Sequence, residues 1–301
     1  MIAADPLYIA ARRVLLDALD ALAEHRRAVI LVGAQAIYLQ ADEAELDASI
    51  APFTKDADLG LDPQQLGNDP RIAEAMTAAG FVLKVKQAGE GGIEPGTWLS
   101  SAKVNGENIH VPVDLLVPEA LAPGHGKRDA RLPEHGKNAA RWTPGLEAIV
   151  LDNTEMTIAS LDPETDTRIA AIRVAGPAAL LVAKAHKIAE RVADVQRGRS
   201  HRLQPKDAGD VIRLMRSPTP PAVIGARLAE LARDEMCGPS VRDGVQHLDA
   251  LFGGRRARGV ELAAEALAGA LSEDSVQALA VNYIEALMAA YRKAATEPTT
   301  P

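Results

Sequence analysis

The sequence predicts an α/β domain over residues 1–170, followed by a helical domain over residues 171–301. Before residue 170, short apolar runs with strand-like alternation are interleaved with amphipathic segments. From Pro177 onward, the apolar residues recur almost wholly at helical spacing. The length of 301 residues also suits two domains of about 100–200 residues each.

The elements expected in the first domain follow from the apolar pattern and from the turn residues that separate its segments. In chain order they are a helix over 7–25, a strand over 28–32, a helix over 34–40, a strand over 56–61, a helix over 70–79, and strands over 81–86, 97–104, 108–117, 148–151 and 157–161. The sequence Asn105-Gly106-Glu107 predicts a hairpin turn. Residues 122–145 are rich in Gly, Pro, His, Lys and Arg and lack periodicity, so a long basic loop is expected there.

The second domain is expected to consist of helices. They are predicted over 177–195, 205–215, 222–232, 241–251, 259–271 and 275–295. Pro177 and Pro205 favour helix starts, because proline fits the first turn of a helix.

Composition limits the classes of protein to consider. The chain has 33 Lys+Arg, 41 Asp+Glu and 47% apolar residues, which is typical of a globular protein and argues against a uniformly basic nucleic-acid binder. Cys237 is the single cysteine, which excludes an intramolecular disulfide and a cysteine-based zinc site and fits a cytoplasmic location. No apolar run approaches the 20 or so residues of a bilayer span, so no membrane association is expected.

Charge is divided along the chain. Residues 1–80 hold six Lys/Arg and thirteen Asp/Glu, whereas residues 184–216 hold nine Lys/Arg and four Asp/Glu. This division suits a cleft with metal ions on one wall and phosphates on the other. Two unrelated solvated faces would produce the same division, and both interpretations stay open.

Three carboxylates are candidates for catalysis. In the strand predicted over 56–61, the period of two places Asp56 and Asp58 on one face. The strand over 108–117 presents Asp114 in the same way. If the two strands are neighbours, the three carboxylates converge and offer the hard oxygen ligands that suit Mg²⁺. The alternative is that Asp56 and Asp58 line the solvent face of an edge strand.

A second candidate feature is the turn in Val32-Gly33-Ala34-Gln35-Ala36. A strand that turns through a glycine into a helix presents backbone N–H groups to a phosphate. An ordinary strand-to-helix turn is the alternative.

Together these residues resemble a known family. Val32-Gly33-Ala34-Gln35-Ala36, Thr54-Lys55-Asp56-Ala57-Asp58 and Val113-Asp114-Leu115-Leu116 resemble motifs of the polymerase-beta-type nucleotidyltransferases, which implies a nucleotidyltransferase fold with a mixed sheet. Lys184-Ala-His-Lys187 and Lys206-Asp207-Ala-Gly-Asp210 are similar to the AbiEii/AbiGii branch, which includes toxins of toxin–antitoxin and phage-defence systems. The resemblance covers residues 28–216.

The resemblance implies roles for individual residues of the first domain. Gly33 and Ala34 correspond to the turn that cradles the phosphates, although Ala34 replaces the usual Ser or Gly and loses a hydroxyl contact. Asp56 and Asp58 correspond to the metal-binding pair, and Asp114 to the third carboxylate, which activates the acceptor hydroxyl at the metal site. Thr54 corresponds to a Ser/Thr near the triphosphate.

The resemblance also implies roles in the helical domain. Lys184 and Lys187 correspond to nucleotide-binding positions, with Lys187 reaching the phosphates, and Asp207 corresponds to an acid near the active site. The residue pattern alone permits plainer roles. Both lysines could be surface residues, and Asp207 could be a first-turn acid that complements the helix dipole, the role we prefer for Asp210. For His186 we expect a buried or surface side chain and no metal.

The expected function is therefore transfer of a nucleoside monophosphate from an NTP, with Mg²⁺ or Mn²⁺ as cofactor. The resemblance implies that the acceptor is the 3′ end of tRNA or another RNA, in a toxin with a cognate antitoxin. A small hydroxylated molecule or a protein side chain is the alternative acceptor, and a non-catalytic nucleotide-binding partner protein is the alternative function. Candidate RNA contacts are Lys127, Arg128, Arg131, Arg197, Arg199 and Arg202, with Lys137 and Arg141 in the same basic loop.

Overall fold

A computed structural model describes residues 5–41, 54–86, 92–122, 128–199 and 203–297. Two compact units make up the described chain. The first takes the described residues within Met1–Ala36, Pro52–Thr143 and Asn153–Ala175, and it holds the sheet. The second takes those within Ile37–Ala51, Pro144–Asp152 and Gly176–Pro301 and is helical. The predicted mixed α/β architecture with a helical C-terminal region is confirmed.

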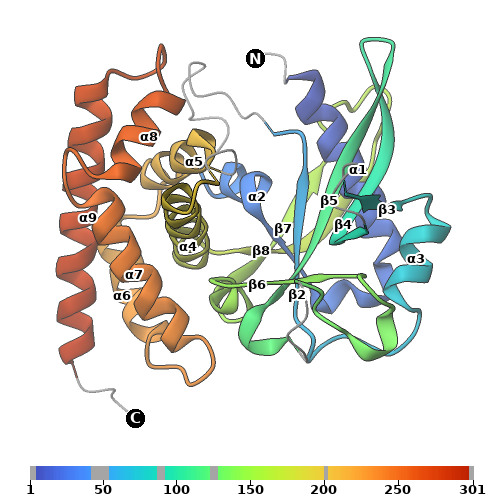
Figure 1. Cartoon of the computed structure of the whole chain (residues 1–301), viewed down its shortest axis with the longest axis horizontal. Helices are drawn as coiled ribbons and strands as arrows, with labels where there is room; N and C mark the ends of the chain where they lie inside the picture. The colour runs from blue at the N-terminus through green and yellow to red at the C-terminus, as the bar shows by residue number, and fades with distance from the viewer. Residues whose placement is uncertain (1–4, 42–53, 87–91, 123–127, 200–202, 298–301) are drawn as a thin grey trace. The chain divides into compact units, whose positions relative to one another are not determined.

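The first unit is built on a mixed sheet of eight strands in the described residues. Its strands are β1 (Val29–Val32), β2 (Ala57–Leu61), β3 (Val82–Val85), β4 (Ile93–Val104), β5 (Glu107–Pro118), β6 (Arg141–Thr143), β7 (Asn153–Ala159) and β8 (Ile169–Ala175). The order is β3-β4-β5-β2-β1-β8-β7, and β6 pairs with β5 outside this path (Figure 1).

Strand direction varies across the sheet. β2 pairs in parallel with β5 and antiparallel with β1, and β1 pairs in parallel with β8. The remaining antiparallel pairs are β3–β4, β4–β5 and β7–β8, whereas β6 runs parallel to β5. The sheet thus places β2, which carries Asp58, between β5, which carries Asp114, and β1, which ends just before Gly33.

Helices accompany the sheet. These are α1 (Pro6–Ala21) and α3 (Ile72–Ala78), with short 3₁₀ helices η1 (Ala23–Ala28), η3 (Glu119–Leu121) and η4 (Pro133–His135). α1 packs against β2, β4, β5 and α3 (Figure 1). Asp5 caps α1 by accepting a hydrogen bond from the Leu7 N–H at 2.8 Å, and Pro6 occupies the first turn.

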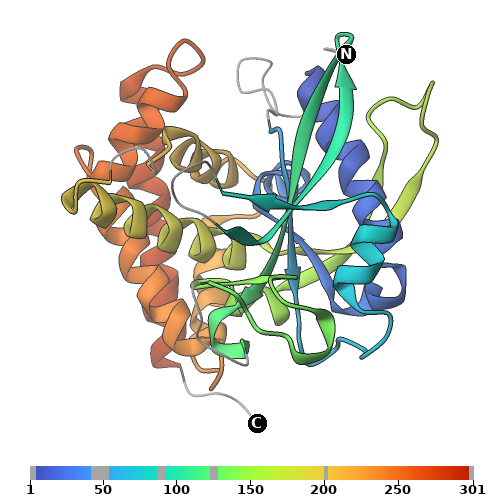
Figure 2. The same ribbon diagram turned by 45° about the vertical axis from the view of Figure 1, so that its right-hand side comes forward.

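The predicted hairpin is confirmed. β4 and β5 form a long antiparallel ribbon (Figure 2) whose turn has positive φ angles at Asn105 (51°) and Gly106 (85°). Two consecutive positive φ angles are typical of a type I′ turn, whose twist matches that of the flanking strands.

The second unit contains the helices expected after Pro177. They are α4 (Pro177–Gln196), α5 (Pro205–Met215), α6 (Pro221–Leu231), α7 (Gly238–Phe252), α8 (Arg258–Ala266) and α9 (Glu273–Thr296). This unit also includes the 3₁₀ helix η5 (Glu147–Val150) and the second half of the shorter helix α2 (Gly33–Gln40), whose first half belongs to the first unit. Pro177, Pro205 and Pro221 lie in first turns, as proline geometry favours. None of the helices in the described ranges has the length and apolar character that a bilayer crossing requires.

Three predictions of local structure were wrong. Residues 148–151 form no strand, because η5 occupies Glu147–Val150 and packs against α4 and α7. Strand β8 was not predicted, because the exposed positions Ile169 and Ala171 are apolar and obscure the alternation that Ile172, Arg173 and Val174 follow. The described part of the basic loop 122–145 contains η4 and β6, because residues 141–143 find a partner in β5.

Candidate functional site

The central feature of the sheet unit is the alignment of two carboxylate-bearing strands. In the parallel pair of β2 and β5, Asp58 is the register partner of Asp114. Asp56 directly precedes β2. The opposite faces of both strands, which include Leu59 and Val113, are fully buried in the core, whereas the three aspartates are only half-buried. The condition set by the sequence, that these two strands be neighbours, is thus met, and β2 and β5 bring Asp58 and Asp114 side by side.

Gly33 lies against Asp58 at the end of β1. Its φ is +67°, a conformation that L side chains rarely adopt. A Cβ atom added to Gly33 would lie only 2.0 Å from Asp58 Oδ2. Glycine is therefore required both by the backbone conformation and by the close approach of the carboxylate, and it starts α2 beside the candidate site.

Asp114 is held by two donors. The Thr97 hydroxyl donates to Asp114 Oδ1 at 2.7 Å, and Arg141 Nη2 donates to Asp114 Oδ2 at 2.6 Å. Arg141 Nη1 also donates to Thr97 Oγ1 at 3.1 Å. The three side chains come from β4, β5 and β6, so three strands fix the position of this carboxylate.

Arg141 faces more than one acid. Its Nη1 lies 3.9 Å from Glu94 Oε1, and Glu94 also pairs with Lys84 at 3.0 Å. Burial alone lowers the pKa of the Arg141 guanidinium, but the charges of Asp114 and Asp58 outweigh burial, and the pKa lies above its usual value. Arg141 is thus a fixed cation beside two of the predicted site residues.

Asp56 is positioned by a chain of hydrogen bonds. The Thr54 hydroxyl donates to Asp56 Oδ1, and Gln35 Nε2 donates to the Asp56 carbonyl oxygen at 3.1 Å. Gln35 Oε1 accepts from Arg12 Nε at 2.8 Å, and Arg12 Nη2 donates to the Tyr8 hydroxyl, also at 2.8 Å. Gln35 and Arg12 are buried, so this chain links the start of β2 to α1 through the first turn of α2.

The fit of a Mg²⁺ ion can be judged from the donors. Asp56 and Asp58 offer half-buried carboxylate oxygens, and Mg²⁺ commonly uses one or two carboxylates together with waters and substrate phosphates. Across the described ranges, no group of three or more His, Cys, Asp and Glu side chains is arranged to hold a metal ion. Asp56 and Asp58 therefore fit a Mg²⁺ ion that would take its remaining ligands from water and substrate, and the expected three-carboxylate cluster is not preformed in the described residues.

The helical unit holds a separate charged cluster. Lys184 Nζ on α4 donates to Asp207 Oδ1 at 2.7 Å and to Asp210 Oδ2 at 2.8 Å, both on α5. Lys187 Nζ donates to the same Asp207 oxygen at 2.9 Å, and Arg213 Nη1 donates to Asp210 Oδ1 at 3.0 Å. The order of the side chains is thus Lys187, Asp207, Lys184, Asp210 and Arg213.

Burial distinguishes the two lysines. The Lys184 side chain is 9% exposed, whereas that of Lys187 is 49% exposed. Burial alone lowers the pKa of Lys184, but the charges of Asp207 and Asp210 raise it well above the usual value. Burial alone raises the pKa of Asp207, but Lys184 and Lys187 lower it by more. Lys184 is therefore a charged core residue, and its predicted contact with a nucleotide stays a prediction.

The preferred role of Asp210 was wrong. Asp210 is fully buried and lies one turn beyond the first turn of α5, where it pairs with Lys184 and Arg213. It is an internal counterion and not a surface acid at a helix start. Asp207 does lie in that first turn, so the helix dipole adds to the stabilisation of its negative charge.

The candidate RNA contacts differ in their surroundings. Arg199 Nη2 pairs with Asp194 Oδ1 at 2.6 Å, and Arg197 lies 4.0 Å from the same oxygen. Arg128 stacks over the Trp142 ring at 4.8 Å from its centre, and Arg131 is exposed. Lys127 and Arg202 lie outside the described residues. Contact of these side chains with RNA stays a prediction.

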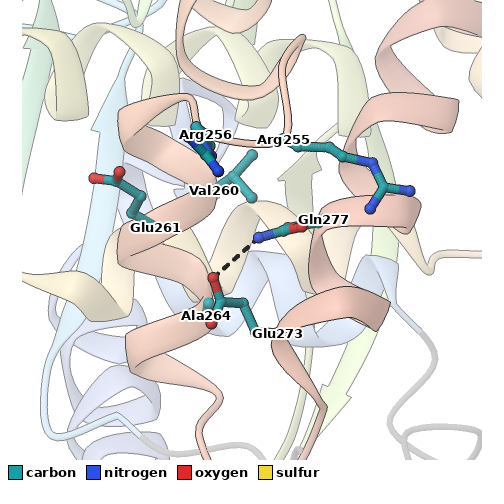
Figure 3. Close-up of a pocket in the computed structure, with 7 residues that line it drawn as sticks. All are labelled: Arg255, Arg256, Val260, Glu261, Ala264, Glu273 and Gln277. Carbon is teal, nitrogen blue, oxygen red and sulfur yellow. Dashed lines mark hydrogen bonds between the residues drawn. The ribbon is translucent and has the colours of Figure 1, made fainter.

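A pocket of about 460 Å³ lies on the helical unit (Figure 3). Arg255 and Arg256 line it from the segment before α8, and Gln277 of α9 donates to Glu273 at 3.0 Å. The negative charges of Glu261 and Glu273 offset the positive charges of the two arginines. No described candidate residue lines this pocket, so it adds nothing to the predicted site.

Sequence reasoning missed several residues that hold the carboxylates in place. The sequence analysis assigns no role to Gln35, although a polar residue in an otherwise apolar run is a usable signal. Arg141 was counted with the basic loop, and Thr97 was only the start of a predicted strand. No local signal pointed to either, because Arg141 is 27 residues from Asp114 along the chain.

Comparison with protein-family models gives no match, and comparison with curated proteins gives no significant match.

Proposed function

We propose that this chain is a divalent-metal-dependent nucleotidyltransferase that transfers a nucleoside monophosphate from an NTP to a hydroxyl acceptor. The observation that carries the proposal is the register pairing of Asp58 with Asp114, with Asp56 two residues before Asp58 and Gly33 in contact with it. A glycine turn into a helix beside acids on two adjacent strands is the arrangement that the motif resemblance requires.

Each side chain has a proposed task. Asp56 and Asp58 would hold a Mg²⁺, which would supply charge stabilisation for the reacting phosphate. The α2 start at Gly33 would face the phosphates with its backbone N–H groups. Asp114 would orient the acceptor hydroxyl for in-line attack on the α-phosphate, with pyrophosphate as the leaving group. Lys187, whose half-exposed ammonium group lies 2.9 Å from the Asp207 carboxylate, would bind phosphate.

The proposed acceptor is the 3′ end of an RNA such as tRNA, and the proposed setting is a cytoplasmic toxin with an antitoxin partner. The support for RNA is the charge on the described candidate arginines Arg128, Arg131 and Arg197, which suits phosphate contacts. The resemblance to the AbiEii/AbiGii branch supports the toxin. A small hydroxylated acceptor or a protein acceptor would use the same carboxylates.

The experiment that tests this proposal follows label into an acceptor. The protein is incubated with Mg²⁺ and each α-labelled NTP in turn, together with total RNA, a protein extract or a metabolite extract. We expect one NTP to label the RNA pool. Label in the protein or metabolite pool would move the proposal to that acceptor, and label in no pool above that seen with Asp58→Asn would contradict the enzymatic function.

A further inference from the structure

Arg141 reaches its place because the backbone of β6 comes very close to β4 and β5. Leu116 of β5 is the register partner of Arg141. Gly96 of β4 has a φ of +73°, and a Cβ atom on it would lie 2.5 Å from the Arg141 backbone nitrogen and 2.6 Å from the Leu115 carbonyl oxygen. Only a glycine permits this approach, so the local backbone is built to bring Arg141 beside Asp114.

The guanidinium then makes a closed ring of hydrogen bonds. Arg141 donates to Asp114 and to Thr97, and Thr97 donates to the other oxygen of Asp114. A planar guanidinium with several fixed donors suits this geometry better than a lysine would. The Asp114 side chain is 17% exposed and that of Arg141 is 26% exposed, so solvent screens the pair only in part.

A divalent ion at Asp114 would compete with this cation. The guanidinium already neutralises Asp114, and its charge acts on Asp58 as well. An ion that approached Asp114 would meet a positive charge held 2.6 Å from Oδ2. An ion that approached Asp56 would meet a carboxylate that accepts a hydrogen bond from the neutral Thr54 hydroxyl, with Asp58 two residues further along the chain.

We propose that Arg141 is a positioning residue that stands in place of a second cation, so that a divalent ion is held by Asp56 and Asp58 while Asp114 is held by Arg141 and Thr97. This inference rests on the proposed function and sharpens it. The protein would hold one divalent ion through two carboxylates, and the third carboxylate would act as a fixed hydrogen-bond acceptor.

The test measures Mn²⁺ binding to the full chain by electron paramagnetic resonance of the free ion, with the metal alone as the probe. Wild-type protein is expected to bind one Mn²⁺ weakly, and Asp58→Asn is expected to weaken binding at least tenfold. Arg141→Gln removes the competing charge and should tighten binding about fivefold or more, whereas Arg141→Lys keeps the charge and should bind within about twofold of wild type.

The decisive variant is the charge-matched double change Asp114→Asn with Arg141→Gln. The double change removes one negative and one positive charge, so the net local charge is unaltered. If Asp114 is not a metal ligand, Mn²⁺ affinity should therefore stay within about threefold of wild type. A loss as large as that of Asp58→Asn would overturn the inference. If the double variant does not fold, unchanged affinity in Arg141→Gln alone would overturn it equally.

The same data separate this inference from the proposed function. The expected binding pattern without labelled product would leave the assignment of Arg141 in place and contradict the nucleotidyltransferase. If wild-type protein forms labelled product but the double variant loses its affinity for Mn²⁺, only the assignment of Arg141 is contradicted. Wild-type protein that binds no Mn²⁺ would contradict the assignment of Arg141, and the labelling experiment would still decide the nucleotidyltransferase, whose ion can take ligands from the NTP.

Discussion

Asp58 of β2 and Asp114 of β5 are register partners in a parallel strand pair, so their carboxylates are held on one face of the sheet. Like charges on paired strands are unfavourable unless a cation lies nearby. Arg141 is such a cation, because its Nη2 lies 2.6 Å from Asp114 Oδ2. The negative charge of Asp56 and Asp58 is the feature that we interpret as a place for a divalent ion.

The first prediction concerns Asp58. Asp58→Asn should abolish nucleotidyl transfer, because one ligand of the ion loses its charge. It should change the urea midpoint little, because Asp58 is only half-buried and asparagine keeps the size of the side chain while it removes the repulsion from Asp114. Glu265→Gln, a change of the same kind on the exposed surface of α8, is the control and should keep full activity. Full activity in Asp58→Asn would refute the assignment.

The second prediction separates the two lysines of α4. Lys187→Ala should raise the KM for NTP and lower kcat, because charge on the phosphates grows in the transition state, and it should change stability by less than about 1 kcal/mol. Lys184→Met should instead destabilise the protein by about 3 kcal/mol, because Asp207 and Asp210 lose a buried counterion. Steady-state kinetics and urea unfolding measure both effects. Equal stability losses in the two variants would show that burial does not separate their roles.

The third prediction uses two glycines with similar backbone angles. Gly33 and Gly80 have φ angles of +67° and +86°, but only Gly33 has a side chain in the space that a Cβ would occupy. Both Gly→Ala changes should lower the free energy of unfolding by about 1 kcal/mol or more through backbone strain. Gly33→Ala should add a further loss and should displace Asp58, which would abolish transfer. Gly80→Ala should keep activity, and comparable activity in both variants would argue against the contact between Gly33 and Asp58.

The fourth prediction concerns pH and two histidines. Burial, aided by the neighbours His25 and His186 respectively, lowers the pKa of His135 and His247 from the usual 6.5. A base with a lowered pKa in the folded state takes up a proton more readily when unfolded. Their contribution to stability is therefore full above about pH 6.5 and declines as the pH falls through that value toward the lower folded pKa.

Urea unfolding between pH 5 and 8 measures this contribution. Each histidine can contribute a slope of at most about 1.4 kcal/mol per pH unit. His135→Gln and His247→Gln should each remove part of the decline. A decline that persists unchanged in the double variant would contradict the proposed cause.

Much of the local secondary structure could be predicted from the sequence, but few of the hydrogen bonds around the candidate site could be. The starts of α4 and α5 were predictable because prolines mark them, and the face that carries Asp56 and Asp58 was predictable from a period of two. The pairing of β2 with β5 could only be stated as a condition, because register between distant strands leaves no local pattern. Arg141 and Gln35 act through partners 27 and 21 residues away, so their roles depend on the folded chain.

Burial was also beyond what spacing could indicate. Lys184 and Lys187 are three residues apart and look alike in the sequence, yet only Lys184 is buried, because α5 packs beside it and supplies two carboxylates. Asp210 was likewise expected to be a first-turn acid, because the sequence does not show that Lys184 and Arg213 lie beside it. A charged residue on a predicted helix face has no fixed burial until the neighbouring helix is known.

The most direct test of the nucleotidyltransferase compares two positions of label in the NTP that the protein uses. With Mg²⁺ and RNA, label at the α-phosphate should appear in the RNA, and label at the γ-phosphate should appear only in pyrophosphate. Both products should vanish with Asp58→Asn and persist with Glu265→Gln. Label from the γ-phosphate in the acceptor, or α-label in RNA that Asp58→Asn does not reduce, would contradict nucleotidyl transfer at this site.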